Sequence, residues 1–96
     1  MKKANNRISL EQCCIYYEIE TTFVQELGRH GLIELTRSGK QAFIDFEQLG
    51  NLEKYMHMHY DLDINMEGME AITHLLNRVQ SLQHEIKKLK GELEKR

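Results

Sequence analysis

The last third of the chain carries its most regular apolar pattern. Seven apolar residues recur three and four positions apart without a break: Ile72, Leu75, Val79, Leu82, Ile86, Leu89 and Leu93. A helix with so narrow a stripe exposes it to water unless a second helix covers it. The rest of the chain can cover only the first turns of this helix. It has too few residues to cover the stripe beyond Leu82 as well. The pattern therefore predicts a homodimer through this helix, with parallel and antiparallel pairing both open.

The preceding residues predict a series of shorter elements. Ser9 and Gln12 form a capping box that starts a short helix. A second helix is expected over residues 21–30, with Gly31 in the left-handed position that ends it. Two β-like runs, residues 32–35 and 41–44, flank a polar turn and indicate a hairpin. A third helix is expected from Asp45 to about Tyr60, followed by a break at residues 61–64 and the long helix.

The order of these elements predicts the fold class. It is that of a mainly α protein with a winged helix-turn-helix head over residues 1–62 and a small β-hairpin as the wing. Residues 63–96 form the long C-terminal coiled-coil helix, and head and helix belong to one structural unit. The chain has 96 residues and no proline, and the absence of proline favours continuous helix.

Composition limits the cellular compartment and the kinds of chemistry that we expect of this chain. No apolar run reaches the length of a membrane span. Cys13 and Cys14 are adjacent, so we expect reduced thiols, of which one is buried and its neighbour less so, in a cytoplasmic protein. The sequence offers no glycine-rich phosphate loop, catalytic triad or metal-ligand spacing. We expect no enzymatic activity, metal, cofactor, small-molecule ligand or membrane contact.

Three segments give the chain a family resemblance. They are Gly31-Leu32-Ile33 after the second helix, residues 44–49 entering the third, and residues 62–69 before the long helix. Over about residues 8–93 the chain resembles the MerR-like superfamily. Residues 62–69 are similar to a segment shared by the HspR-type repressors and by the chaperone modulators of the CbpM family, which are close to this chain in length.

The resemblance to CbpM implies a protein partner. Members of that family bind the J-domain of a DnaJ-like or CbpA-like co-chaperone and restrain its activity. The same role here implies that the chain blocks the surface that the J-domain offers to its heat-shock chaperone. The HspR-type alternative implies a transcriptional regulator that binds DNA.

A departure from the DNA-binding pattern favours the modulator. DNA-binding members carry Arg-Tyr-Tyr-Glu before the glycine that Gly31 matches, and the first two of these positions are Gln25 and Glu26 here. A glutamate on the recognition face is repelled by DNA phosphates. Residues 1–62 hold seven Lys and Arg against nine Asp and Glu, so the formal charge of −2 of the whole chain belongs to the head.

The candidate site residues follow from these charges. The acidic and apolar side chains that suit a basic partner such as a J-domain helix are Glu18, Glu20, Glu26, Tyr16 and Leu35. The glutamates fit a merely solvated acidic face equally well, and the two apolar residues fit the core. If the alternative holds, Arg29, Arg37 and Lys40 are the expected phosphate contacts.

Overall fold

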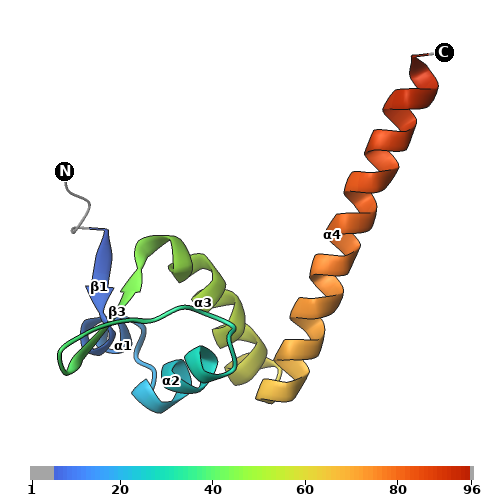
Figure 1. Cartoon of the computed structure of the whole chain (residues 1–96). Coiled ribbons are helices and arrows are strands. Elements are labelled where there is room, and N and C mark those ends of the chain that lie inside the picture. Colours follow the sequence, from blue (N-terminus) through green and yellow to red (C-terminus); the bar gives the residue numbers. More distant parts are fainter. Residues whose placement is uncertain (1–5, 96) are drawn as a thin grey trace. The chain divides into compact units, whose positions relative to one another are not determined.

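The computed structural model describes residues 6–95, which contain a mainly helical chain with one small sheet (Figure 1). The chain divides into two compact units, residues 1–66 and residues 67–96. The first unit contains the whole of the predicted head. The elements are β1 (Arg7–Ser9), α1 (Leu10–Tyr17), α2 (Thr21–Arg29), β2 (Thr36–Ser38), β3 (Gln41–Asp45), the 3-10 helix η1 (Phe46–Gln48), α3 (Leu49–Met56), the π-helix η2 (His57–Asp61) and α4 (Met66–Glu94).

The first two helices form the predicted helix-turn-helix. The Ser9 hydroxyl accepts a hydrogen bond from the backbone N–H of Gln12 at 3.1 Å, which confirms the cap that starts α1. Helix α1 ends at Glu18, whose left-handed backbone (φ 57°) turns the chain toward α2. Gly31 follows α2 with φ 74°, the conformation predicted for it, which glycine adopts without a steric penalty.

The sheet differs from the predicted hairpin in two ways. It has three antiparallel strands in the order β1-β3-β2, and β1 was not predicted. The first wing strand is Thr36–Ser38, so the expectation of a strand over residues 32–35 is wrong. Gly39 adopts φ 65° in a two-residue turn, which pairs Ser38 with Gln41 and fixes the register. Residues 32–35 instead lead into the wing, with Ile33 buried.

The predicted third helix is three consecutive helical pieces. Residues 46–48 form the 3-10 helix η1, and Asp45 before it makes no side-chain capping hydrogen bond. After α3 the chain widens into the π-helix η2, where the Leu62 N–H donates to the His57 carbonyl at 3.1 Å. Asp63, at φ 58°, lies in the predicted break.

The core of the head is formed by apolar side chains from α1, α2, α3, η2 and β3 and from the segment between α2 and β2. Those that are buried are Leu10, Cys13, Cys14, Phe23, Val24, Leu27, Ile33, Ala42, Ile44, Leu52, Tyr55 and Met58. Both cysteines are free thiols and both are buried, so the expectation that one is less buried is wrong. Small thiol side chains pack like apolar groups in such a position.

Helix α4 carries the predicted apolar stripe along its length. Ile72 is half-buried, and every described residue from His74 onward is exposed. The stripe residues from Leu75 to Leu93 are between 47% and 67% exposed. Among residues 6–95, no helix combines the length and the apolar character that a membrane crossing requires.

Candidate functional site

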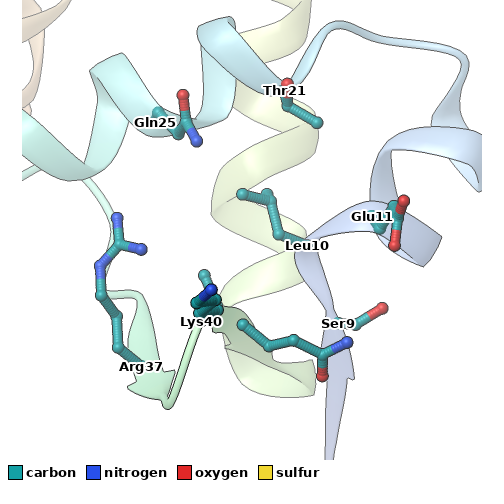
Figure 2. Close-up of a pocket in the computed structure, with 9 residues that line it drawn as sticks. Ser9, Leu10, Glu11, Thr21, Gln25, Arg37 and Lys40 are labelled. Atoms are coloured by element: carbon teal, nitrogen blue, oxygen red, sulfur yellow. The ribbon is translucent and has the colours of Figure 1, made fainter.

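The first candidate surface lies between α2 and the wing, and we call it the wing face. A shallow pocket of about 220 Å³ opens there. Figure 2 shows Thr21 and Gln25 reaching toward it from α2, and the Arg37 guanidinium extending from the wing toward Gln25. Its lining residues are Ser9, Leu10, Glu11, Thr21, Gln25, Arg37, Lys40, Gln41 and Ala42.

A second pocket adjoins the first and extends the wing face along α2. It measures about 490 Å³ and is lined by Gln25, Gly28, Arg29, Leu35 and Arg37. Because Gln25 and Arg37 line both pockets, the structure brings the three predicted phosphate-contacting cations onto one surface. Arg37 and Lys40 contribute from the wing, and Arg29 contributes from the end of α2.

Glu26 lies differently from the sequence-based expectation. It lines neither wing-face pocket, whereas its neighbour Gln25 lines both. Glu26 is half-buried, forms an ion pair with Arg29, and approaches His30 Nε2 at 3.6 Å. Residues three and four apart are neighbours on a helix, so the pairing is local. The glutamate therefore neutralises Arg29, one of the three cations of the wing face.

The second candidate surface lies at the C-terminal end of α1, beside α3 and η2. It is a groove of about 310 Å³, which we call the acidic groove. Its lining residues are Tyr17, Glu18, Ile19, Glu53, Met56, His57, Tyr60 and Asp61. Three of them are carboxylates, and His57 is the only lining residue that can carry a positive charge. Four others present apolar or aromatic surface, so the groove combines negative charge with an apolar wall.

Two hydrogen bonds order the acidic groove. The Tyr17 hydroxyl donates to Glu53 Oε2 at 2.7 Å, which ties α1 to α3 across 36 positions of sequence. His57 Nδ1 lies 2.7 Å from Asp61 Oδ2 within one turn of η2. Burial, reinforced by the hydrogen bond to Glu53 and its negative charge, raises the pKa of the Tyr17 phenol well above its usual range. Tyr17 therefore remains a neutral donor at physiological pH.

Two large apolar side chains are exposed near the end of α1, and one of them borders the acidic groove. Ile15 and Tyr16 are 65% and 77% exposed, and both come from the last turns of the helix. The Tyr16 ring meets the Tyr17 ring edge-on, with 4.9 Å between the centroids. Since Tyr17 lines the groove, this ring contact makes Tyr16 and the groove one continuous surface.

The predicted partner-binding residues do not all lie together. Glu18 lines the acidic groove and Tyr16 borders it, whereas Glu26 and Leu35 lie at α2 and the wing. Glu20 is exposed at the start of α2, 3.5 Å from the Thr22 hydroxyl. A Cβ built on Gly28 would lie 3.0 Å from Leu35 Cδ1, so Leu35 packs closely over α2.

The groove residues that sequence reasoning missed come from the third helix and the π-helix. Glu53 and Asp61 enter the sequence analysis only through the net charge of residues 1–62. Their spacing in sequence gives no sign that they meet Glu18. A signal that does exist is the i, i+4 spacing of His57 and Asp61, which on a helix permits the observed pair.

The two cysteine thiols are not placed as reactive groups. Burial raises the pKa of both thiols, that of Cys13 to about 11, with the neighbouring Cys14 adding to the effect. Both cysteines are therefore protonated and unreactive at neutral pH. Within residues 6–95, no three His, Cys, Asp or Glu side chains gather closely enough to hold a metal ion.

Comparison with known proteins identifies the family. No curated protein and no solved structure matches the chain. The sequence model of the family described as MerR HTH family regulatory protein matches residues 8–91, which include both candidate surfaces and most of α4. The chain therefore belongs to the MerR helix-turn-helix regulatory protein family.

Proposed function

We propose that this protein is a non-enzymatic chaperone modulator of the CbpM kind, which binds the J-domain of a DnaJ-like co-chaperone. The observation that carries the proposal is the acidic groove with the exposed Tyr16 ring at its border. Large exposed apolar side chains beside a charged groove are typical of a protein-binding surface. We expect the protein to act in the cytoplasm, where its two free thiols stay reduced.

The charge of the groove supports a basic partner. J-domains resemble one another in carrying a basic helix, which the carboxylates of Glu18, Glu53 and Asp61 attract. Such complementarity raises the association rate and selects the partner, while buried apolar contacts supply most of the affinity. Bound in this way, the modulator covers the surface that the J-domain needs for its heat-shock chaperone, so inhibition is steric competition.

The proposal is tested by titrating the full chain with DnaJ-like co-chaperones of the same organism. Calorimetry is expected to give a dissociation constant in the micromolar range or below. The stimulation of the chaperone's ATPase by the co-chaperone is expected to fall as the modulator is added. No binding at tens of micromolar would exclude the proposal, and binding without loss of ATPase stimulation would exclude the competitive mechanism.

We further propose that α4 pairs with α4 of a second copy of the chain. The exposed stripe from Leu75 to Leu93 supports this, since β-branched residues at one core position and leucine at the other favour two strands. Leu82→Asp would place a charge in the centre of the seam, and self-association is expected to weaken more than a hundredfold. Asn77→Asp adds the same charge off the seam and is the control.

The experiment that tests the pairing is sedimentation of the unmodified chain and the two variants. A dimeric mass is expected for the unmodified chain and for Asn77→Asp, and a monomeric mass for Leu82→Asp. A monomeric unmodified chain at tens of micromolar would contradict the pairing.

DNA binding is the second candidate function, and one observation favours it. Arg29, Arg37 and Lys40 lie on the wing face together with Gln25, and in helix-turn-helix proteins the second helix enters the major groove. A gel-shift experiment at about 50 mM salt tests it, because non-specific DNA binding is strongest at low salt. A protein that shifts no duplex under those conditions is not a DNA-binding regulator.

A further inference from the structure

The acidic groove has the size of a side-chain pocket rather than of a cofactor site. At about 310 Å³ it lies at the lower limit of small-molecule pockets. Tyr17, Met56 and Tyr60 supply aromatic and thioether surface, and Glu18, Glu53 and Asp61 supply carboxylate oxygens. A long side chain with an apolar stem and a cationic end matches both halves of this lining.

The carboxylates retain the capacity to bind a cation. A carboxylate accepts about four hydrogen bonds, so Glu53 has acceptor sites left after its bond from Tyr17. That bond also fixes the Glu53 carboxylate in place before a ligand arrives, which lowers the entropy lost on binding. Glu18 is held by the left-handed turn that ends α1 and lies on the same groove.

Arginine fits the groove better than lysine does. Its planar guanidinium stacks on tyrosine rings and donates two parallel hydrogen bonds to one carboxylate, whereas the lysine ammonium is compact and strongly hydrated. Tyr17 and Tyr60 both line the groove, and Glu53 stands beside Tyr17. A phosphate group, by contrast, would be repelled by the three carboxylates.

The exposed Tyr16 ring indicates what precedes or follows the arginine. Tyr16 is exposed, and its ring touches that of Tyr17 at the groove. A helix that places an arginine in the groove brings an apolar residue three or four positions away over this ring. The two requirements together describe a basic amphipathic helix.

We propose that the acidic groove is an anchor site for one arginine of a basic amphipathic helix, whose apolar side lies on Tyr16. This inference rests on the proposed function and names the part of the head and the chemistry by which the partner is held. The arginine forms charge-assisted hydrogen bonds with Glu53 and Glu18, and its guanidinium stacks against Tyr60.

The inference is tested with three synthetic helical peptides titrated into the full chain. The first carries leucines and one arginine at the spacing above, the second carries lysine in place of the arginine, and the third carries citrulline. Citrulline keeps the shape of arginine and removes its charge. We expect citrulline to weaken binding at least tenfold and lysine to weaken it about threefold. Equal binding of the arginine and citrulline peptides would overturn the proposal.

Matched variants of the protein locate the effect. Glu53→Gln keeps an acceptor for the Tyr17 hydroxyl and removes one charge, and it is expected to weaken the arginine peptide roughly tenfold. Glu47→Gln removes the same charge from an exposed position that does not line the groove and is expected to change binding less than twofold. Thermal unfolding of both variants controls for folding, and equal effects of the two would place the peptide elsewhere.

The same variants separate this inference from the proposed function. If a J-domain binds the unmodified chain and Glu53→Gln equally well, the groove is not its anchor, although the protein remains a modulator. If no J-domain binds while the arginine peptide still depends on Glu53, the groove is a cation anchor and its partner belongs to another class.

Discussion

The two surfaces of the head differ in how their charges are used. On the wing face three cations lie near Gln25, but one of them, Arg29, is neutralised by Glu26 on the same helix. In the acidic groove three carboxylates lie beside an apolar wall, and none of the lining residues is a lysine or an arginine. The formal charge of −2 does not show this division, because it is the sum over a basic surface and an acidic one.

The difference shows that one scaffold carries two surfaces of opposite charge. The helix-turn-helix and the wing are set mainly by caps, turns and the core. Surface side chains alone then decide whether the head attracts phosphate or a basic protein. Family membership therefore establishes the fold, whereas the function depends on the residues of each surface.

Reversing one charge in the groove is expected to have the largest effect on J-domain binding. Glu53→Lys places a cation beside the proposed arginine site and is expected to weaken J-domain binding roughly 100-fold or more. Arg37→Glu reverses a charge on the wing face and is expected to change the affinity less than about threefold. Calorimetry measures both, with thermal unfolding as the folding control. Comparable losses in the two variants would show that the two surfaces act together.

Salt is expected to have a smaller effect on J-domain binding, and this effect distinguishes the two surfaces. Raising the salt from about 0.05 to 0.5 M shortens the range of charge interactions severalfold and is expected to weaken J-domain binding roughly tenfold, chiefly through slower association. Stopped-flow measurements should show a shallower salt dependence for Glu53→Gln and an unchanged one for Arg37→Gln. A shallower dependence in the wing variant instead would assign the partner to the wrong surface.

The hydrogen bond that orders the groove contributes to stability. Tyr17→Phe removes the bond to Glu53 and is expected to lower the free energy of unfolding by about 1 kcal/mol at neutral pH. The pKa of Tyr17 is raised in the folded state. The Tyr17 phenol therefore ionises at a lower pH in the unfolded chain than in the folded protein. The stability that the neutral phenol contributes is lost as pH rises above about 10.

Denaturant unfolding between pH 8 and 11 measures this contribution. The decline in stability above pH 10 is expected to be shallower in Tyr17→Phe than in the unmodified chain. Cys13, whose pKa is raised to about 11, contributes a similar decline in both proteins and leaves the difference between them unchanged. Identical pH profiles would show that the Tyr17 bond does not persist in solution.

The smallest expected effect lies on the wing face. Glu26→Gln leaves Arg29 without its ionic partner and is expected to raise the residual low-salt affinity for duplex DNA about threefold. Fluorescence anisotropy with a labelled duplex measures the change, and Glu47→Gln serves as the charge-matched control. An unchanged affinity would show that the ion pair does not restrain Arg29 from contacting phosphate.

Local sequence signals predicted the parts of the fold that local chemistry determines. The Ser9 cap, the left-handed Gly31 and the break near Asp63 all follow from preferences of a few neighbouring residues. Strand β1 escaped prediction because three residues carry no periodicity and are defined by pairing with β3. The wing register was misplaced because it is set by the turn at Gly39 and not by the apolar run before it.

The candidate site was less accessible to prediction for the same reason. Tyr17 and Glu53 lie 36 positions apart and meet only after α1 and α3 pack. The three predicted glutamates come from different places in the fold: Glu18 ends α1, Glu20 precedes α2, and Glu26 lies within α2. Only Glu18 of the three lines the acidic groove. Charge counted along the chain revealed that the head is acidic, and the fold alone shows where the acid is concentrated.

The most direct test of the account is a nuclear magnetic resonance footprint of a J-domain on the labelled full chain. The account predicts that the largest shifts fall on Tyr16, Tyr17, Glu53 and Tyr60, while Gln25, Arg37 and Lys40 remain unchanged. A footprint centred on the wing face, or the absence of any footprint at saturating J-domain, would contradict the claim that this head binds a protein through its acidic groove.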